Sequence, residues 1–133
     1  PTMRMGRRGF TLIELLIVVV IIGILATIAV SKYNEARARS AQSTVRASLR
    51  DLAIHQEIAH HTTGSYVGDP GPEEFVHTPD VTVSIAAAGP TGWAATATHA
   101  AWPGKQCAIW VGDESFKSLA PPATQEGVIE CSQ

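Results

Sequence analysis

The sequence predicts an α+β fold in which one long N-terminal helix packs on a small antiparallel sheet of three to four strands. Three observations support this class. An uncharged apolar run occupies residues 15–30, the helical spacing of apolar residues continues to about residue 61, and a two-residue alternation typical of strands follows. The chain has 133 residues, of which 45% are hydrophobic. It therefore has room for one modest domain with an appended segment, and collagen-like or wholly disordered chains are excluded.

The apolar run is long enough to cross a membrane. Extended back to residue 10, it contains only one ionisable group, Glu14, and it rises roughly 31 Å as a helix, close to the thickness of a bilayer hydrocarbon core. Three arginines precede it, so the positive-inside rule places the N-terminus in the cytoplasm. A secretory signal would have a small-residue cleavage site after the apolar core, and none follows here. Hydropathy alone therefore favours a plain single-pass anchor.

Glu14 points to something more specific than an anchor, because a carboxylate at mid-membrane costs about 2.5–3.5 kcal/mol and usually has a functional partner. Residues 7–16 read Arg-Arg-Gly-Phe-Thr-Leu-Ile-Glu-Leu-Leu, which closely resembles the cleavage site of type IV prepilins and the related pseudopilins. In that family a membrane peptidase cuts after the glycine at the cytoplasmic face and methylates the new N-terminal amine. The resemblance implies cleavage between Gly9 and Phe10, N-methylation of Phe10, and roles in filament assembly for Phe10 and Glu14.

The charges at this site support that interpretation. After cleavage, the amine of Phe10 and the carboxylate of Glu14 would lie one helical turn apart, where they favour the helix dipole. In a packed filament Glu14 could instead reach the amine of a neighbouring subunit and set the axial register, since removing one member of a buried pair costs several kcal/mol. The alternative is a glutamate that only snorkels to interfacial water.

The resemblance also divides the chain into four parts. It implies a leader peptide at residues 1–9, a transmembrane and assembly half of the helix at 10–31, an amphipathic half at 32–63, and a globular head at 64–133. The family commonly has a helix-breaking proline eight residues after the glycine that Gly23 matches, and this chain has Ser31 there. Whether the helix is kinked or melted between Gly23 and Ser31 is therefore left open.

The amphipathic half carries two apolar stripes, and the helix has a plausible C-terminal cap in Gly64. One stripe has the spacing of a single helical face: Ala38, Ala41, Val45, Leu49, Leu52 and Ala59. The second, nearly opposite, consists of Ala47, Ile54 and Ile58. Two stripes fit a helix that contacts its own domain on one side and neighbouring subunits on another. A helix clasped deeply by a small domain is the alternative.

The head begins with a loop rich in turn residues at 64–79, which holds Pro70, Pro72, Glu73 and Glu74. Strands are predicted at 81–85, 93–99 and 107–111, with a short fourth at 127–131. Consecutive strands joined by short turns form an antiparallel meander. Its apolar face would pack on the first helical stripe, which resembles the pilin head domain.

The two cysteines, Cys107 and Cys131, lie in the part that should face outside the cell. An even number in a small exported domain predicts a disulfide, and a pair of free buried thiols is the alternative. The segment between them resembles the variable disulfide-bounded loop of type IV pilins, which would make it a natural surface for partners.

No enzyme, cofactor or metal centre is predicted. The five histidines lack the spacing of zinc ligands, and no nucleophile or phosphate-loop motif occurs. Cys107 with His99 is not a convincing nucleophile pair. Asp113 and Glu114 could contribute oxygen ligands to calcium, but solvated turn acids are the simpler interpretation. Residues 62–133 carry two basic against eight acidic residues, which gives no support to direct nucleic-acid binding.

The functional hypothesis is a structural subunit of a type IV pilus, assembled by helix packing into a homo-oligomeric extracellular filament for adhesion, motility or DNA uptake. The implied partners are the prepilin peptidase, an inner-membrane assembly platform and minor pilins, and the subunit would reside in the inner membrane before assembly. A type II secretion pseudopilin, which forms a periplasmic pseudopilus, is the close alternative. A monomeric membrane-anchored binding module is the alternative from a different class.

Overall fold

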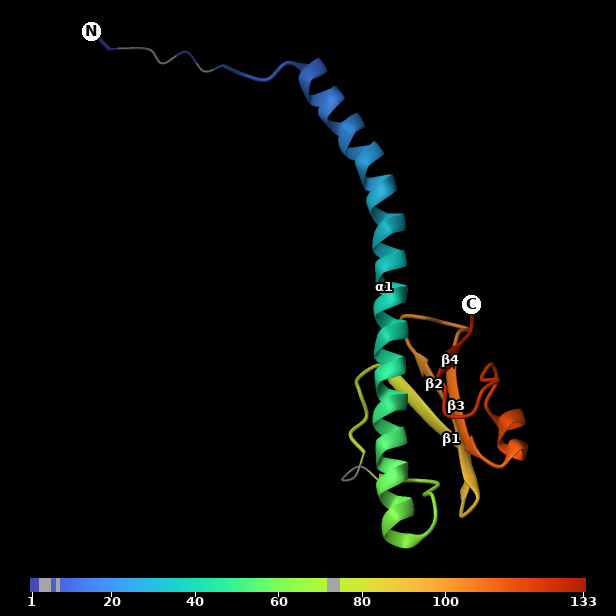
Figure 1. Ribbon diagram of the computed structural model, residues 1–133. Helices are drawn as coiled ribbons and strands as arrows, with labels where there is room; N and C mark the ends of the chain where they lie inside the picture. The colour runs from blue at the N-terminus through green and yellow to red at the C-terminus, as the bar shows by residue number, and fades with distance from the viewer. Residues whose placement is uncertain (3–5, 7, 72–74) are drawn as a thin grey trace. The chain divides into compact units, whose positions relative to one another are not determined.

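The computed structural model describes residues 1–2, 6, 8–71 and 75–133. It contains α1 (Leu12–Thr63), β1 (Val81–Gly89), β2 (Gly92–His99), β3 (Cys107–Gly112), the 3-10 helix η1 (Glu114–Leu119) and β4 (Glu130–Cys131) (Figure 1). The predicted α+β class, one long helix with an antiparallel sheet, is confirmed. Arg4, Arg7, Pro72, Glu73 and Glu74 of the sequence analysis lie outside the described residues. The chain divides into two compact units, Pro1–Ala36 and Arg37–Gln133.

The first unit contains the apolar part of α1. Its large apolar side chains are exposed, from 48% for Val18 to 89% for Leu12, and by length and composition this helix could cross a membrane. The helix is continuous through the region that the sequence left open. The hydroxyl of Thr27 donates to the Gly23 carbonyl at 3.0 Å, and that of Ser31 donates to the Ile28 carbonyl at 3.1 Å. Ser31 keeps the backbone N–H that a proline would lack, so it does not break the helix.

The second unit packs the other part of α1 on the sheet. Val45, Leu49 and Leu52 are each 0% exposed and contact Trp93 and Ile109 in one core cluster, so the first predicted stripe is confirmed as the core-facing side. The second stripe is not enclosed. Its members are exposed: Ala47, Ile54 and Ile58. The deeply clasped helix is therefore the wrong alternative.

The sheet is antiparallel with the strand order β1-β2-β3-β4, as expected for a meander. Strand β1 continues to Gly89 through a register irregularity between Ile85 and Ala87, so it is longer than predicted. Strand β4 is shorter than predicted and begins at Glu130. One face of the sheet packs on α1. On the other face, a small cluster is formed by Ala94, Ala108, Trp110, Ala120 and Ala123.

Two glycines are required by the backbone at the ends of these elements. Gly64 has φ of 78° and its N–H donates to the His60 carbonyl at 2.8 Å, so the predicted helix cap is confirmed. Gly92 begins β2, and a Cβ there would lie 2.3 Å from the Val111 carbonyl oxygen. That close approach lets β2 and β3 pair directly beside the turn.

Candidate functional site

The start of α1 is organised by reciprocal hydrogen bonds between Thr11 and Glu14. The Thr11 backbone N–H and hydroxyl donate to the Glu14 carboxylate at 2.8 and 3.0 Å. The Glu14 N–H donates back to the Thr11 hydroxyl at 3.3 Å. This arrangement is a capping box, which satisfies backbone donors that would otherwise lack partners at a helix N-terminus. Glu14 therefore has a partner within its own chain.

Sequence reasoning missed Thr11, although the Thr-x-x-Glu spacing before an apolar run is the signal of a capping box and was present. The expected partner of Glu14 was the amine of a cleaved Phe10. In the full chain, Phe10 still forms a peptide bond with Gly9 and therefore has no free amine.

The predicted cleavage position lies just before the helix. Gly9 and Phe10 are exposed and outside regular structure, with the Phe10 residue 90% exposed. The chain around Gly9 is open, since nothing lies within 4 Å of the position that a Cβ would take. The Gly9–Phe10 bond is therefore sterically accessible to a peptidase.

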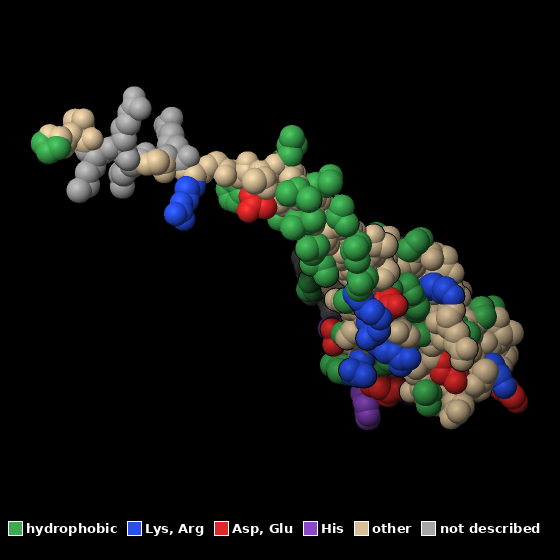
Figure 2. Space-filling view, turned by 90° about the horizontal axis from the view of Figure 1, so that it is seen from above, with side chains coloured by type: hydrophobic (Ala, Val, Ile, Leu, Met, Phe, Trp, Pro, Cys, Tyr) green, Lys and Arg blue, Asp and Glu red, His purple; other side chains and the backbone are tan. Residues whose placement is uncertain are grey.

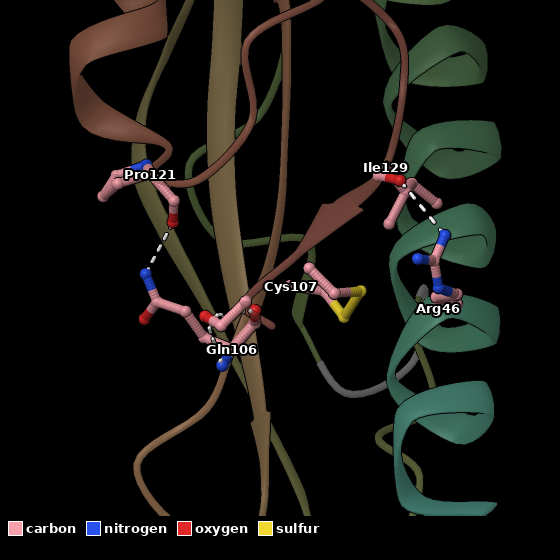
Figure 3. Close-up of a disulfide and its surroundings, with 7 residues drawn as sticks. Arg46, Gln106, Cys107, Pro121 and Ile129 are labelled. Carbon is pink, nitrogen blue, oxygen red and sulfur yellow. Dashed lines mark hydrogen bonds between the residues drawn. A yellow bond between two sulfur atoms is a disulfide. The ribbon is translucent and has the colours of Figure 1, made fainter. Parts of the chain in front are cut away.

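The head contains the disulfide that the sequence predicted. Cys107 and Cys131 are joined and face each other in the β3–β4 register, so the pair of free thiols and a Cys107 nucleophile are both excluded. Figure 3 shows two hydrogen bonds beside it. Arg46 Nη1 of α1 donates to the Ile129 carbonyl at 3.2 Å, and Gln106 Nε2 donates to the Pro121 carbonyl at 2.6 Å. The disulfide and these bonds fix the segment between the cysteines at both ends.

The acidic side chains of this segment hold its turns. Asp113 caps η1 by accepting the Ser115 N–H at 2.9 Å, and this bond lowers the pKa of Asp113. Glu126 accepts the Gly112 N–H at 2.8 Å. The Glu130 carboxylate accepts the backbone N–H and the hydroxyl of Thr124, and these bonds lower the pKa of Glu130.

The metal interpretation gains no geometric support. Asp113 uses its carboxylate as a helix cap. Within residues 1–2, 6, 8–71 and 75–133 no group of three or more His, Cys, Asp or Glu side chains is arranged to hold an ion.

An open hollow of about 850 Å³ lies beside the β2–β3 loop, and its walls include Asp80, His99, Trp102 and Lys105. His99 Nδ1 accepts the Ala101 N–H at 2.9 Å, and Lys105 donates to the carbonyl of the C-terminal residue. These polar groups hold the surrounding loops together.

An exposed Gly9–Phe10 bond, a capped apolar helix and a disulfide-closed head with a four-stranded antiparallel sheet give the chain a pilin-like α+β fold. Residues 4–30 match the family model described as the prokaryotic N-terminal methylation motif. The resemblance that residues 7–16 suggested is thereby confirmed.

Curated relatives extend the likeness beyond the motif. The chain is 54% identical over 50 residues to the type IV major pilin protein PilA of Myxococcus xanthus, which covers 38% of this chain and 23% of the relative. It is 42% identical over 62 residues to the type IV wide pilus major component PilA4 of Thermus thermophilus, which covers 47% of each chain. Identity with the type IV major fimbrial protein FimA of Dichelobacter nodosus is 55% over 49 residues, which covers 37% of this chain and 30% of the relative. The chain thus spans between about a quarter and a half of the length of the curated relatives it matches.

Proposed function

We propose that this chain is a structural subunit of a type IV pilus, held in the inner membrane and then assembled by helix packing into an extracellular filament. The observation that carries the proposal is an apolar helical segment that lies within the matched methylation motif, residues 4–30, and is not covered by its own chain. Its large apolar side chains between Leu12 and Val30 are 48–89% exposed. In water this surface would aggregate, so lipid or the helices of other subunits must cover it.

The proposed division of the chain follows from this requirement. Residues 1–9 are a leader that stays cytoplasmic, 10–31 cross the membrane and later pack in the filament, 32–63 connect the span to the head, and 64–133 form the exposed head. A prepilin peptidase, an inner-membrane assembly platform and minor pilins are the proposed partners. The chain itself contributes packing surfaces and no catalysis.

The partner of the Glu14 carboxylate is proposed to change when the leader is cleaved. Before processing, Thr11 satisfies the carboxylate at the membrane interface. Hydrolysis of the Gly9–Phe10 bond creates a cationic amine at Phe10, which is a stronger partner for a carboxylate than a neutral donor. In the filament, Glu14 pairs with such an amine and sets the register between subunits.

The first test is the intact mass of the protein in filaments sheared from intact cells. We expect a species that begins at methylated Phe10 and lacks the two thiol hydrogens of Cys107 and Cys131. The same mass found only in the cell envelope would indicate a type II secretion pseudopilin instead. A full-length mass that retains Arg7 and Arg8 would overturn the proposal in favour of a simple membrane anchor.

Glu14→Ala tests the role of the carboxylate, with Glu35→Ala as the control that removes a carboxylate elsewhere on α1. We expect Glu14→Ala to be cleaved normally but to yield few filaments, whereas Glu35→Ala resembles the wild type. Normal filament abundance from Glu14→Ala would refute the register role while leaving the pilin proposal intact.

A further inference from the structure

Strand β1 is an outer strand of the sheet, and in the described part of the chain it pairs only with β2. Its nine residues include no charged side chain and no proline, although these are features that commonly protect an edge strand from further pairing. Figure 2 shows Lys, Arg, Asp and Glu side chains spread over the face of the molecule in view, and β1 contributes none of them. The edge of β1 is therefore suited to accept another strand.

The hydrogen bonds around the start of β1 show which of its backbone groups face outward. In an antiparallel pair, alternate residues turn their N–H and C=O groups toward the neighbouring strand and away from it. The Ala100 N–H donates to the Asp80 carbonyl at 2.9 Å, which turns Asp80 toward β2. The next residue, Val81, turns away, and its N–H donates to the Thr78 carbonyl at 3.2 Å. In the same phase, Thr82 and Ser84 bond to β2, whereas Val83 and Ile85 face the outer edge.

The loop after α1 covers both ends of this edge and leaves its middle open. Thr78 closes one end, and the Tyr66 N–H donates to the Gly89 carbonyl at 3.1 Å near the other. Between these bonds, the outward N–H and C=O groups of Val83 and Ile85 form no hydrogen bond with residues 8–71 or 75–133. The two residues are about 7 Å apart in extended backbone. Four backbone hydrogen-bonding groups thus lack a protein partner over a short length of the edge.

A cleft of about 320 Å³ lies beside these groups. It is lined by residues 83–85 of β1, by residues 68–70 and His77 of the loop after α1, and by Leu52 and Phe75. Leu52 and Phe75 are 0% and 2% exposed, so they give the cleft an apolar, packed base. Ligand sites have volumes of about 300–1,000 Å³, and a cleft at the small end of this range has room for a short segment of one chain.

We infer that this cleft binds an extended peptide segment of another protein, which pairs with the edge of β1 as an added antiparallel strand. Backbone hydrogen bonds supply the recognition in this mode of binding, and alternate side chains supply the specificity. An antiparallel partner exchanges two hydrogen bonds with Val83 and two with Ile85, which would satisfy all four unpaired groups. The inference goes beyond the proposed filament function, because every group in it belongs to the second unit.

The sides of β1 define the chemistry of the segment. Directly opposed residues of an antiparallel pair place their side chains on the same face. The side chains of Val83 and Ile85 pack against the core, so the peptide residues opposite them require apolar side chains. Ser84 is exposed, so the residue opposite it is polar. The expected segment is uncharged and reads apolar, polar, apolar.

The β1 strand of a second copy is a less suitable occupant. Its outer edge has the same unpaired groups, but residues 68–70 and His77 of its own loop line the cleft beside that edge. Two such edges would have to displace both loops in order to pair. A single extended segment is bare on both of its edges and brings no second loop with it.

Amide hydrogen exchange of the full chain in detergent micelles tests whether the edge is open. We expect the Val83 and Ile85 amides to exchange at least about tenfold faster than those of Thr82 and Ser84, which bond to β2. Equal protection of all four amides at every protein concentration would show that the chain closes its own edge. Protection that develops only as the protein concentration is raised would assign the edge to a second copy. Either of these results would overturn the inference.

The binding probe is the acetylated and amidated pentapeptide Thr-Val-Thr-Val-Thr, titrated into the isotope-labelled full chain and followed by amide chemical shifts. We expect shifts centred on residues 83–85 and slower exchange of the two outward amides. N-methylation of both valines blocks the N–H groups that face β1, and should weaken binding by about fivefold or more because two hydrogen bonds are lost. The matched control is N-methylation of the central threonine, whose N–H faces away, and it should change the affinity by less than about twofold.

Val83→Pro tests the same contact from the side of the protein. Proline removes the outward N–H of residue 83 but no bond to β2, and edge strands tolerate proline in this position. We expect peptide affinity to fall by about fivefold or more, with the protection of Thr82 and Ser84 unchanged. Val83→Thr keeps the N–H and should bind the peptide as the wild type does. The comparison of the two N-methylated peptides uses the wild-type chain, so it stands even where Val83→Pro fails to fold.

The outcomes leave the proposed function separately testable. Chemical shifts that do not change at residues 83–85, or equal affinity for the two N-methylated peptides, would overturn the inference. Neither result would alter the mass of the subunit in sheared filaments, which is the test of the proposed function.

Discussion

The two parts of α1 obtain their stability in different ways. In the second unit, Val45, Leu49 and Leu52 are fully buried against the sheet of the same chain. In the first unit, side chains of the same chemical kind, such as Leu16 and Ile21, are 63% and 55% exposed. The backbone is helical in both, so the difference lies in what covers the side chains.

This difference shows which part of α1 is stabilised by contacts within its own chain. A helix gains most of its stability from packing of its apolar face rather than from intrinsic propensity. The second part finds that packing in its own head. The first part finds no such packing within its own chain, and its large apolar side chains are exposed. The function proposed above covers them with lipid or with neighbouring helices.

The largest expected effect contrasts two leucines of the one helix. Leu49→Ala should lower the free energy of unfolding of the head by about 3–5 kcal/mol, because it leaves a cavity in a fully packed core. The matched control, Leu16→Ala, should leave that value unchanged within about 0.5 kcal/mol. Denaturant unfolding of the full chain in detergent, followed by tryptophan fluorescence, measures both. Equal losses would mean that the two parts of α1 are not independent.

Removing the disulfide should have the next largest effect on stability, and this effect should be confined to the head. The cysteines are 24 residues apart, and the chain-entropy model gives about 3.5 kcal/mol for closing such a loop. The double variant Cys107→Ala and Cys131→Ala should therefore unfold at lower denaturant concentration. Far-UV circular dichroism of the apolar helix in detergent should persist after the head has unfolded, and its simultaneous loss would contradict the comparison.

The second part of α1 is also held to its own head by a polar side chain, Gln56. Its side chain is 1% exposed, donates to the Val67 carbonyl at 2.6 Å and accepts the Val67 N–H at 2.8 Å. Gln56→Leu should cost about 1–3 kcal/mol, because it leaves two backbone groups of the loop after α1 without partners. Hydrogen exchange at the Val67 amide should become faster than in the control Asp51→Leu, which changes an exposed position of the same helix. Unchanged exchange would show that the loop is held by other contacts.

The smallest effect is a dependence on pH. Hydrogen bonds from Thr124 hold the pKa of Glu130 below its usual 4.5. In the unfolded chain this carboxyl takes up a proton first as pH falls, so its contribution to stability is complete above about pH 4.5 and is lost as pH falls through the folded pKa. Thermal unfolding of Glu130→Gln should therefore change less between pH 5 and pH 3 than that of the wild type. A parallel decline in both would exclude this carboxylate as a source of acid sensitivity.

Periodicity was enough to predict α1, the order of the strands and the core stripe, because apolar spacing records which side of an element is buried. It missed contacts that join polar side chains to distant backbone. The pairing of Gln56 with Val67 and of Arg46 with Ile129 depends on how loops return to the helix, and no spacing encodes that. The capping box at Thr11 was readable locally but was obscured by the expectation of an amine partner for Glu14. Strand β1 is longer than predicted. The apolar–polar alternation stops at Ala86–Ala88, so the predicted strand ended at residue 85, whereas the backbone continues to pair with β2 through a register irregularity.

The order of the elements along the chain also determines how the molecule responds to tension. Helix α1 is uninterrupted from Leu12 to Thr63, and every strand of the sheet follows it in the chain. A pulling force applied at two points on α1 is therefore carried by helical hydrogen bonds acting in series, and no strand of the sheet lies in its covalent path. The sheet register and the disulfide would stay unloaded while the helix stretches, so in the filament proposed above the head would keep its folded surface under tension.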